Sequence, residues 1–368
     1  MREPLKKTVE KEWLLLAFLA IMLVLALVFP RRIPSYPSYI DWSTIVALAG
    51  LLVISTGIKQ SGYLEDFAMR ILSGVKTERG LAFFLSLLSA LMAMFVTNDV
   101  TLFIVVPLAL SLQEILGRSM VKTVVVEVLA VNAGSALTPI GNPQNIFLWQ
   151  SSGVSFLSFA LAMLPVFLVL FLVLLLTIFL IFPAEPLTLP ASNGIPSLDR
   201  RLFSVSSALL LIFIVSVELG LSFYSLPAVL LAYLFIRPSA LKRTDWPLLL
   251  LFMVMFIDFR IISDIPAISD LIVTASPQGT FGTSILLSQV MSNVPATIFL
   301  SNLTDNWRIL AWGANVGGSG LAIGSLASII ALRLYGGREI WKEFHRYSMP
   351  YLFLTALLVL AAVILQNP

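Results

Sequence analysis

The chain contains 368 residues, of which 58% are hydrophobic and only 12% are charged, and its mean hydropathy is +0.97. Soluble domains carry about twice that share of charged residues, so the composition predicts an all-α polytopic membrane protein. The chain has no cysteine and one histidine, His345, which excludes thiolate chemistry and a histidine metal cluster. No enzymatic activity is expected.

Seven apolar segments are long enough to predict membrane-spanning helices: 13–29, 40–58, 155–182, 201–219, 222–236, 246–260 and 347–366. The first follows a basic N-terminal stretch but lacks a small-residue cleavage site, so it is interpreted as a retained helix. Residues 58–80 are of mixed polarity with apolar residues at helical spacing, which predicts an amphipathic helix along the membrane interface.

Residues 81–112 form an apolar run that is interrupted by the polar residues Thr97, Asn98 and Asp99. As a single helix this run would be about 48 Å long at ~1.5 Å per residue, which exceeds one ordinary span. A re-entrant hairpin with Thr97 to Asp99 at its tip, or two spans, fits the length better.

Residues 122–150 predict a helix that is broken between Ser135 and Pro143. The stretch 131–150 reads VNAGSALTPIGNPQNIFLWQ and holds Asn132, Asn142 and Asn145. A break at membrane depth is tolerated only where it lines a cavity or is buried in protein. Breaks at matching positions in two halves of a chain are typical of a transporter's binding site.

The second half of the chain repeats these features in the same order. Asp245-Trp246 corresponds to Asp41-Trp42, and Ser292-Asn293 corresponds to Thr97-Asn98. Aligning Asn315 with Asn132 also pairs Ile323-Gly324 with Ile140-Gly141. We therefore predict a first repeat over 1–182, a linker plus an extra transmembrane helix over 183–221, and a second repeat over 222–368.

The number of predicted crossings makes the two repeats inverted relative to each other. With the N-terminus in the cytoplasm, every lysine and arginine lies on the cytoplasmic side except Arg31, Arg32, Arg260 and Arg308. The positive-inside rule therefore favours a multi-pass protein of the cytoplasmic (inner) membrane with a cytoplasmic N-terminus. The basic pI of about 9.2 reflects this topology, and no nucleic acid partner is expected.

Three motifs carry a resemblance to a known family: NPQN at 142–145, SNVP at 292–295 and AIGSLAS at 322–328. With them the chain resembles the ion-transporter superfamily, which contains arsenite permeases, sodium–proton antiporters of type D and divalent-anion or citrate–sodium symporters. It is most similar to small putative anion permeases of the arsenite-permease branch. The resemblance implies two inverted repeats, each with a re-entrant hairpin and a broken helix. It also implies a homodimeric scaffold and a transport domain that moves in elevator fashion.

The hairpin tips and helix breaks supply the predicted binding residues. Carbonyls and Asn, Ser or Thr oxygens suit Na⁺, whereas helix N-termini favour an anion. The candidates are Thr97, Asn98, Asp99, Asn132, Thr138, Gly141, Asn142, Asn145, Ser292, Asn293, Asn315, Gly317, Gly318, Ser319 and Ser325. Among them, Asn98, Asp99, Asn132 and Asn142 are the candidates for Na⁺. The first break is expected to hold the coupling ion more firmly, since the second is mainly glycine and serine.

Two acidic residues are candidate proton sites. An ionisable group within the membrane is costly, which makes Asp99 a functional candidate, with capping of the second hairpin helix as the alternative. Glu127 either carries a proton or lies near the cytoplasmic interface. Asp258, Arg260 and Glu218 are expected at the outer interface, paired or solvated.

These patterns predict a secondary active transporter of a small anion or oxyanion, coupled to Na⁺ or H⁺ and needing no cofactor. The alternative is a sodium–proton antiporter that moves no anion. The chain has no GxxxxGK[ST] motif, so it is not expected to drive transport with ATP by itself. An ATPase partner subunit remains an alternative. Its expected partners are the anionic substrate, the lipid bilayer and a second copy of the chain.

Overall fold

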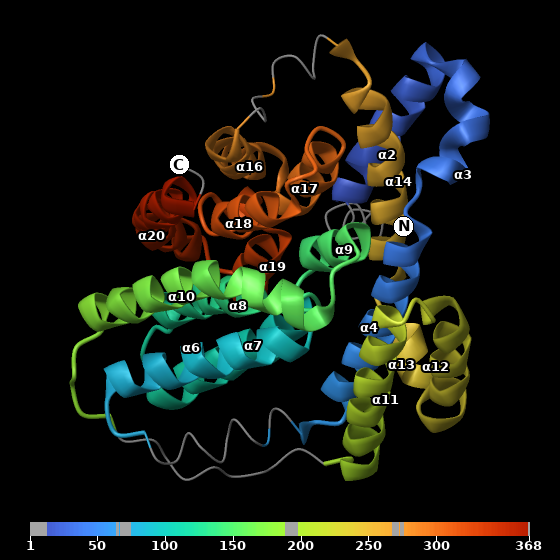
Figure 1. Ribbon diagram of the computed structural model, residues 1–368. Helices are drawn as coiled ribbons and strands as arrows, with labels where there is room; N and C mark the ends of the chain where they lie inside the picture. Colours follow the sequence, from blue (N-terminus) through green and yellow to red (C-terminus); the bar gives the residue numbers. More distant parts are fainter. Residues whose placement is uncertain are drawn as a thin grey trace, which may run out of the picture.

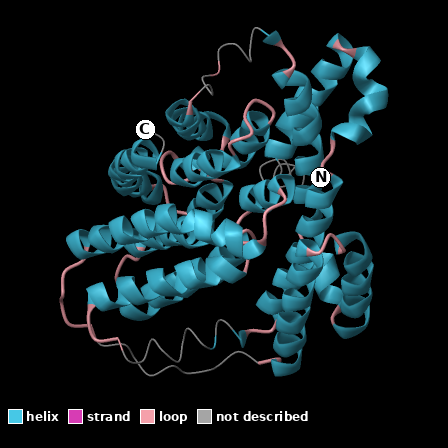
Figure 2. Ribbon diagram, viewed as in Figure 1, coloured by secondary structure: helices cyan, strands magenta, loops and turns pink. Residues whose placement is uncertain are grey.

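The computed structural model describes residues 13–63, 66, 75–187, 198–266, 272 and 276–366. Within these ranges the regular structure is helical, apart from one isolated bridge between Thr77 and Pro186 (Figure 2). Six of the described helices are long and apolar enough to cross a membrane. The prediction of an all-α polytopic membrane protein is therefore confirmed.

The helices form two groups (Figure 1). On the right of the view lie α2 (Trp13–Val28), η1 (Pro30–Ser35), α3 (Tyr36–Tyr39), α4 (Trp42–Gln60), α11 (Arg200–Glu218), α12 (Ser222–Ile236), α13 (Pro238–Arg243) and α14 (Trp246–Ser263). On the left lie α6 (Glu78–Phe95), α7 (Asn98–Leu116), α8 (Val121–Ser135), α9 (Pro143–Ser152), α10 (Phe156–Ile181), α16 (Pro277–Met291), α17 (Asn293–Ser301), α18 (Trp307–Gly317), η2 (Ala322–Gly324), α19 (Leu326–Tyr335) and α20 (Glu339–Gln366). We call the first set the outer group and the second the inner group. They meet where α4 contacts α7 and α9, and where α14 contacts α17.

Within the outer group, α4 and α14 begin in the same way. Asp41 caps α4 by accepting a hydrogen bond from the backbone N–H of Thr44 at 3.1 Å, and Asp245 accepts from Leu248 at 3.3 Å. The tryptophan that follows each aspartate donates its indole N–H to the carbonyl oxygen five residues earlier in the chain. This shared local structure agrees with the correspondence found in the sequence, while the inverted relation of the two halves stays a prediction.

Helices α6 and α7 form the expected hairpin. The chain turns at Val96 and Thr97, and Arg118, just after α7, approaches Glu78 at the start of α6 with an N–O distance of 4.0 Å. The two open ends therefore lie together, at the opposite end from the turn. In the second half α16 and α17 pack against each other around Ser292, and α17 is the shorter helix.

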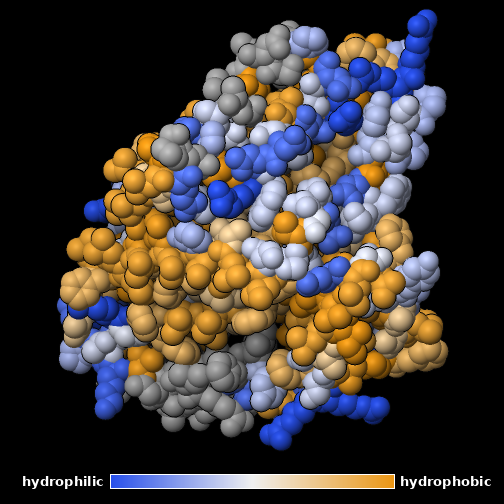
Figure 3. Space-filling model, viewed as in Figure 1, coloured by the Kyte–Doolittle hydropathy of each residue, from blue (hydrophilic) through white to orange (hydrophobic). Residues whose placement is uncertain are grey.

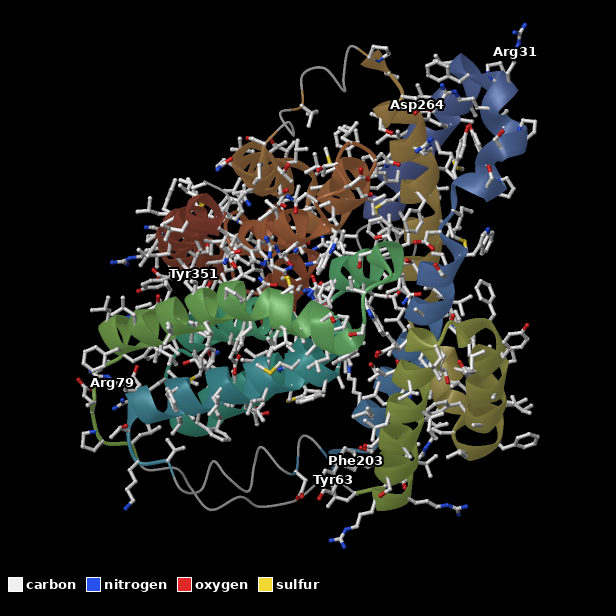
Figure 4. The ribbon with its side chains drawn as sticks, in the orientation of Figure 1. Arg31, Tyr63, Arg79, Phe203, Asp264 and Tyr351 are labelled. Atoms are coloured by element: carbon white, nitrogen blue, oxygen red, sulfur yellow. The ribbon has the colours of Figure 1, made fainter. Side chains whose placement is uncertain are left out.

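Helix α8 is buried along its whole length within the inner group, where it packs against α6, α7, α10, α19 and α20. At Gly134 an added Cβ would lie 2.1 Å from the carbonyl oxygen of Ala90, so only glycine permits this approach of α8 to α6. Nearby, the hydroxyl of Tyr351 on α20 donates to the carbonyl of Leu170 on α10 at 2.7 Å (Figure 4).

The outward surfaces of α10, α11, α12 and α20 are apolar. Large hydrophobic side chains are exposed there, such as Leu180, Leu211, Phe235 and Leu365. Figure 3 shows a broad hydrophobic area on the face in view. Exposure of apolar surface on this scale is typical of contact with lipid.

Three expected segments differ from the structure or lie partly outside it. The C-terminal helix α20 begins at Glu339 rather than near residue 347, so it also contains His345. Residues 64–65 and 67–74 of the expected amphipathic helix, and residues 188–197 between the first repeat and α11, lie outside the described residues. Just after α4, Tyr63 stacks on Phe203 of α11 with ring centroids 4.2 Å apart (Figure 4).

Candidate functional site

Both predicted helix breaks are present. The first break, residues 136–142, separates α8 from α9, and the second break, residues 318–325, separates α18 from α19 and contains the short helix η2. Hydrogen bonds between the two breaks and their flanking helices show that residues about 170 to 196 positions apart in the chain lie in contact. The breaks therefore build one shared site.

Four buried asparagines connect the breaks. The Asn315 amide nitrogen donates to Oδ1 of Asn145 at 2.9 Å, and the Asn142 amide nitrogen donates to Oδ1 of Asn315 at 3.0 Å. Asn132 donates to the carbonyl oxygen of Gly318 at 3.1 Å and accepts from the Ser325 hydroxyl at 3.3 Å. A buried network with all members satisfied is rigid, so these amides hold the two breaks in a fixed relation.

The first break is also stabilised from within. The Asn145 amide nitrogen reaches the carbonyl oxygens of Ser135, Ala136 and Thr138 at 3.1 to 3.2 Å, which satisfies acceptors left unpaired where α8 ends. Asn142 caps α9, since its Oδ1 accepts from the backbone N–H of Asn145 at 2.9 Å. The asparagine side chains thus replace the helical hydrogen bonds that the break removes.

The first hairpin is tied to the first break by two hydrogen bonds. The backbone N–H of Asn98 donates to the carbonyl oxygen of Gly141 at 3.1 Å. The hydroxyl of Thr138 donates to the carbonyl oxygen of Met94, near the end of α6, at 2.6 Å. Tip and break therefore form one unit.

Side chains that the sequence did not single out support the second break. Gln289 of α16 donates to the carbonyl of Gly317 and accepts from the backbone N–H of Leu321 at 2.6 Å. The ring Nε2 of His345 accepts from the backbone N–H of Ala322 at 3.2 Å. The break is mainly backbone, as expected, but α16 and α20 supply the groups that hold it. Gln289 is one of several polar residues in α16, so the sequence carried no signal that singled it out.

The two hairpin tips, the start of α9 and the second break with the start of α19 line one narrow cavity of about 10 Å³, which we call the central cavity. Its lining includes Asn98 and Asn293 from the tips, Pro143 from α9 and Ser325 from the second break. Leu248 and Phe252 of α14 complete the lining that separates it from the outer group. This volume has room for about one water molecule, so the site is closed around its centre in this conformation.

Helix N-termini converge on the central cavity. Asn98, Pro143, Asn293 and Leu326 are the first residues of α7, α9, α17 and α19, and all of them line it. Each helix N-terminus carries a partial positive charge of roughly half an elementary charge. The lining of the cavity thus contains four helix N-termini and no lysine or arginine.

Both hairpin tips carry a buried hydroxyl with no hydrogen-bond partner among the described residues. These belong to Thr97 and Ser292, which correspond in the two halves and are 2% and 1% exposed. Ser319 in the second break has a third such hydroxyl. Buried polar groups are normally satisfied, so these atoms point to water or a bound ligand.

The backbone at the second tip is strained. Ser292 has φ 77° and ψ 153°, the one positive φ outside glycine in the described part of the chain. This conformation is essentially confined to glycine and costs about 1 to 3 kcal/mol. Next to it, a Cβ added to Gly318 would lie 2.8 Å from the amide nitrogen of Asn293, so break and tip approach closely.

The two candidate proton sites, Asp99 and Glu127, are described to different extents by the structure. Asp99 is the second residue of α7, but its side chain lies outside the described part of the structure. Glu127 on α8 is fully buried, and neither carboxylate oxygen has a partner among the described residues. No group of acidic or histidine side chains suited to a metal occurs in the described ranges.

The interpretation of Asp258 as paired or solvated at the outer interface is wrong. Its side chain on α14 is fully buried, and both oxygens lack a partner within the described residues. Arg260 is exposed and donates to Asn302 at 3.4 Å, because residues two apart on a helix face different directions. Glu218 accepts from the backbone N–H of Phe156 at 3.3 Å.

Discontinuous helices that meet inside a bundle of membrane-spanning helices define a polytopic membrane transporter. Comparison with known proteins agrees with this class. The model of the citrate transporter family (CitMHS) matches residues 8–317, and the chain belongs to that family. The resemblance to the ion-transporter superfamily is thereby confirmed.

Curated relatives extend over most of the chain. "Inner membrane protein YbiR" of Escherichia coli is 38% identical over 97% of both chains. "Uncharacterized transporter MJ0456" of Methanocaldococcus jannaschii is 32% identical over 81% of this chain and 82% of that protein. "Uncharacterized transporter Rv2684" of Mycobacterium tuberculosis is 26% identical over 85% of this chain and 83% of that protein.

Proposed function

We propose that this protein is a secondary active transporter of a small anion or oxyanion, coupled to Na⁺ or H⁺. The observation that carries the proposal is the convergence of the N-termini of α7, α9, α17 and α19 on the central cavity. Backbone N–H groups at helix N-termini bind anions, and broken helices in transporters present them to anionic substrates. The family description as citrate transporters supports an anionic substrate.

The coupling ion is assigned to the hairpin tips and the first break. The unpartnered hydroxyls of Thr97 and Ser292, with the amides of Asn98, Asn132 and Asn142, offer neutral oxygens of the kind that Na⁺ prefers. Asp99, the second residue of α7, follows Asn98 in the chain. Proton coupling is the other option, and the unpartnered carboxylate of Glu127 supports it.

The proposed mechanism is elevator-type alternating access, in which the inner group moves as a transport domain against the outer group as a scaffold. The inner group holds both hairpins and both breaks, while the outer group contributes Leu248 and Phe252 to the lining of the central cavity. This part of the contact is apolar, and the hydrogen bonds between the two groups at Arg260–Asn302 and Phe156–Glu218 involve side chains of exposed residues, where water can replace them. The exposed apolar faces of α11 and α12 in the outer group are the proposed homodimer contact.

The proposed location is the inner membrane with a cytoplasmic N-terminus. The printed name of the Escherichia coli relative and the distribution of basic residues support it.

Flux into proteoliposomes tests the function. We expect labelled citrate, phosphate or sulfate to exchange across the membrane in a saturable way, with a rate that depends on an imposed Na⁺ or pH gradient. Empty liposomes and the Asn293→Ala variant are the controls for leakage and for use of the central cavity. If no anion is transported but Na⁺ and H⁺ exchange in its absence, the sodium–proton antiporter is correct and the anion proposal fails. Unitary conductance in a planar bilayer would instead identify a channel.

A further inference from the structure

A second and larger cavity, of about 260 Å³, lies between the outer group and the first hairpin. Its lining includes Lys59 and Gln60 from the end of α4, Arg243 and Asp245 around the end of α13, and Thr97 at the hairpin tip. We call it the basic cavity. Two cations and one carboxylate give it a net charge of +1, and Asp245 is engaged in capping α14.

Hydrogen-bond donors without partners line the basic cavity. The Gln60 side-chain oxygen accepts from the Ser239 hydroxyl at 2.7 Å. The amide nitrogen of the same side chain has no hydrogen-bond partner among the described residues. The Thr97 hydroxyl, on a residue that is 2% exposed, is likewise unsatisfied there. Unpaired buried donors beside cations indicate a site for an acceptor-rich, negatively charged ligand.

The basic cavity adjoins the central cavity at the tip of the first hairpin. Thr97 lines the basic cavity and its neighbour Asn98 lines the central cavity. Across the basic cavity, the Lys59 ammonium lies 4.2 Å from the ring centroid of Phe103 on α7, which holds this charge at the wall facing the hairpin. An anion that occupies the basic cavity is therefore one residue away from the central cavity.

We propose that the basic cavity is an anion-binding antechamber that takes a small oxyanion or carboxylate before it reaches the central cavity. Lys59, Arg243 and Gln60 supply the donors. Its volume is below the roughly 300–1,000 Å³ of pockets for drug-sized ligands, which suits an anion of few atoms. The route to the central cavity rests on the proposed function, whereas anion binding in the basic cavity does not.

The natural absence of cysteine allows a direct test. Thr56 lines the basic cavity, and the Thr56→Cys variant introduces a single thiol there. We expect the negatively charged reagent methanethiosulfonate ethylsulfonate to react faster than its ethyltrimethylammonium analogue, relative to their rates with a free thiol. Adding Arg243→Gln is expected to lower this preference about tenfold, because a unit charge in the lining of the cavity raises the local concentration of the anionic reagent.

The matched control is Lys242→Gln, which removes the same charge one residue away, outside the lining of the basic cavity. It is expected to change the preference less than about twofold, because an exposed charge beyond the cavity is screened by water and salt. Equal effects of the two substitutions would overturn the proposal. Val100→Cys, on the opposite wall, repeats the measurement if Thr56→Cys does not fold.

Protection experiments identify the ligand. The Thr56→Cys protein is labelled in phosphatidylcholine vesicles at constant ionic strength. We expect at least one of citrate, phosphate and sulfate to slow this labelling threefold or more. Adding Lys59→Gln together with Arg243→Gln should abolish that protection. Lack of protection by all three overturns the proposal. Equal protection by phosphatidylglycerol in the vesicle would also overturn it, because the occupant would then be a lipid headgroup.

Transport separates this proposal from the proposed function. The Arg243→Gln variant is expected to raise the KM about tenfold on the side where the basic cavity opens, with kcat unchanged, whereas Lys242→Gln is not. Transport with identical KM values in the two variants would refute the antechamber and leave the transporter assignment intact. Anion protection without any transport would support anion binding in the basic cavity and contradict the proposed transport function.

Discussion

The amide nitrogen of Asn315 lies 2.9 Å from Oδ1 of Asn145, and this hydrogen bond joins two helix breaks that are 170 residues apart in the chain. Both residues are buried, and loss of either side chain removes this link, although Asn315 keeps its bonds to Asn142 and Ala311 and Asn145 keeps those to the first break. The relative position of the two halves of the site therefore depends on this pair.

We expect Asn145→Ala and Asn315→Ala each to destabilise the protein by about 1 to 3 kcal/mol, the cost of an unsatisfied buried amide. The double variant should lose less than the sum, with a coupling of about 0.5 to 3 kcal/mol. Thermal unfolding followed by tryptophan fluorescence measures both. The control is Asn302→Ala, because the Asn302 amide bonds to Ile298 at 2.9 Å and to Arg260 at 3.4 Å and to neither break; its effect should be additive with that of Asn145→Ala. Strict additivity of the first pair would mean that the bond does not couple the breaks.

Substitution of Ser292 separates backbone strain from the role of its hydroxyl. Ser292→Gly should raise the Tm, since glycine adopts φ 77° without the cost of about 1 to 3 kcal/mol that serine bears. Ser292→Ala keeps the strain and should not raise the Tm. Both variants lose the unpartnered hydroxyl. If both show the same fall in apparent Na⁺ affinity, the loss of that hydroxyl is the cause. A lower Tm for the glycine variant would show that the hydroxyl has a stabilising partner.

The positions of the helices and breaks could be predicted because local sequence specifies them. The helix 222–236 was predicted with the bounds that α12 has, since apolar length alone defines it. The first break was found because Asn142 precedes Pro143, a residue pair that favours the start of a helix. The resemblance between the halves identified both hairpin tips and both breaks.

The partners that hold the site together could not be predicted. Gln289 and His345 contact the second break from α16 and α20, and a single polar residue in a helix does not specify which neighbour it faces. Asp258 was misplaced because the nearby Arg260 suggested an ion pair, although side chains two residues apart on a helix diverge. The packing of one helix against another determines such contacts, and sequence spacing alone does not show it.

The two hairpin tips should both influence coupling. We expect Asn98→Ala and Asn293→Ala to raise the Na⁺ concentration for half-maximal transport about tenfold, which corresponds to one lost ligand of about 1.4 kcal/mol. The bond from Asn98 to Gly141 is made by the backbone N–H, so Asn98→Ala retains it. Sodium titration of transport measures the effect, with Asn302→Ala as control. An unchanged Na⁺ dependence in both variants would disprove the assignment of an ion site to each tip.

Asp199 should make stability depend on acidic pH. The backbone N–H of Leu202, and then the bond to the Arg237 guanidinium, lower the pKa of Asp199 below its usual value of 3.8. A carboxylate with a lowered pKa stabilises the fold above its unfolded pKa, and this stabilisation is lost as the pH falls through the folded pKa. Asp199→Asn should thus lower the Tm at pH 7, with the difference shrinking below about pH 4. Glu114→Gln, which removes an exposed carboxylate from α7, should show no such pH profile.

Glu127 tests whether a proton is the coupling ion. Its carboxylate is fully buried on α8 with no partner among the described residues, a position where an ionised group costs several kcal/mol. Glu127→Gln keeps the shape and removes the charge, so we expect a Tm at pH 7 equal to or above that of the natural protein. If protons couple through this residue, the transport rate of the variant should no longer change between about pH 5.5 and 8.5. This interval roughly covers the pKa values that buried carboxyl groups can reach.

Glu218→Gln is the control, since it removes a carboxylate that is exposed at the end of α11. It should leave the pH dependence of transport unchanged. A natural pH profile in the Glu127→Gln variant, together with Na⁺ dependence, would exclude Glu127 as the proton carrier and assign coupling to the oxygens at the hairpin tips. A large fall in Tm would instead mean that Glu127 has a structural partner, because an unpaired buried carboxylate does not stabilise the fold.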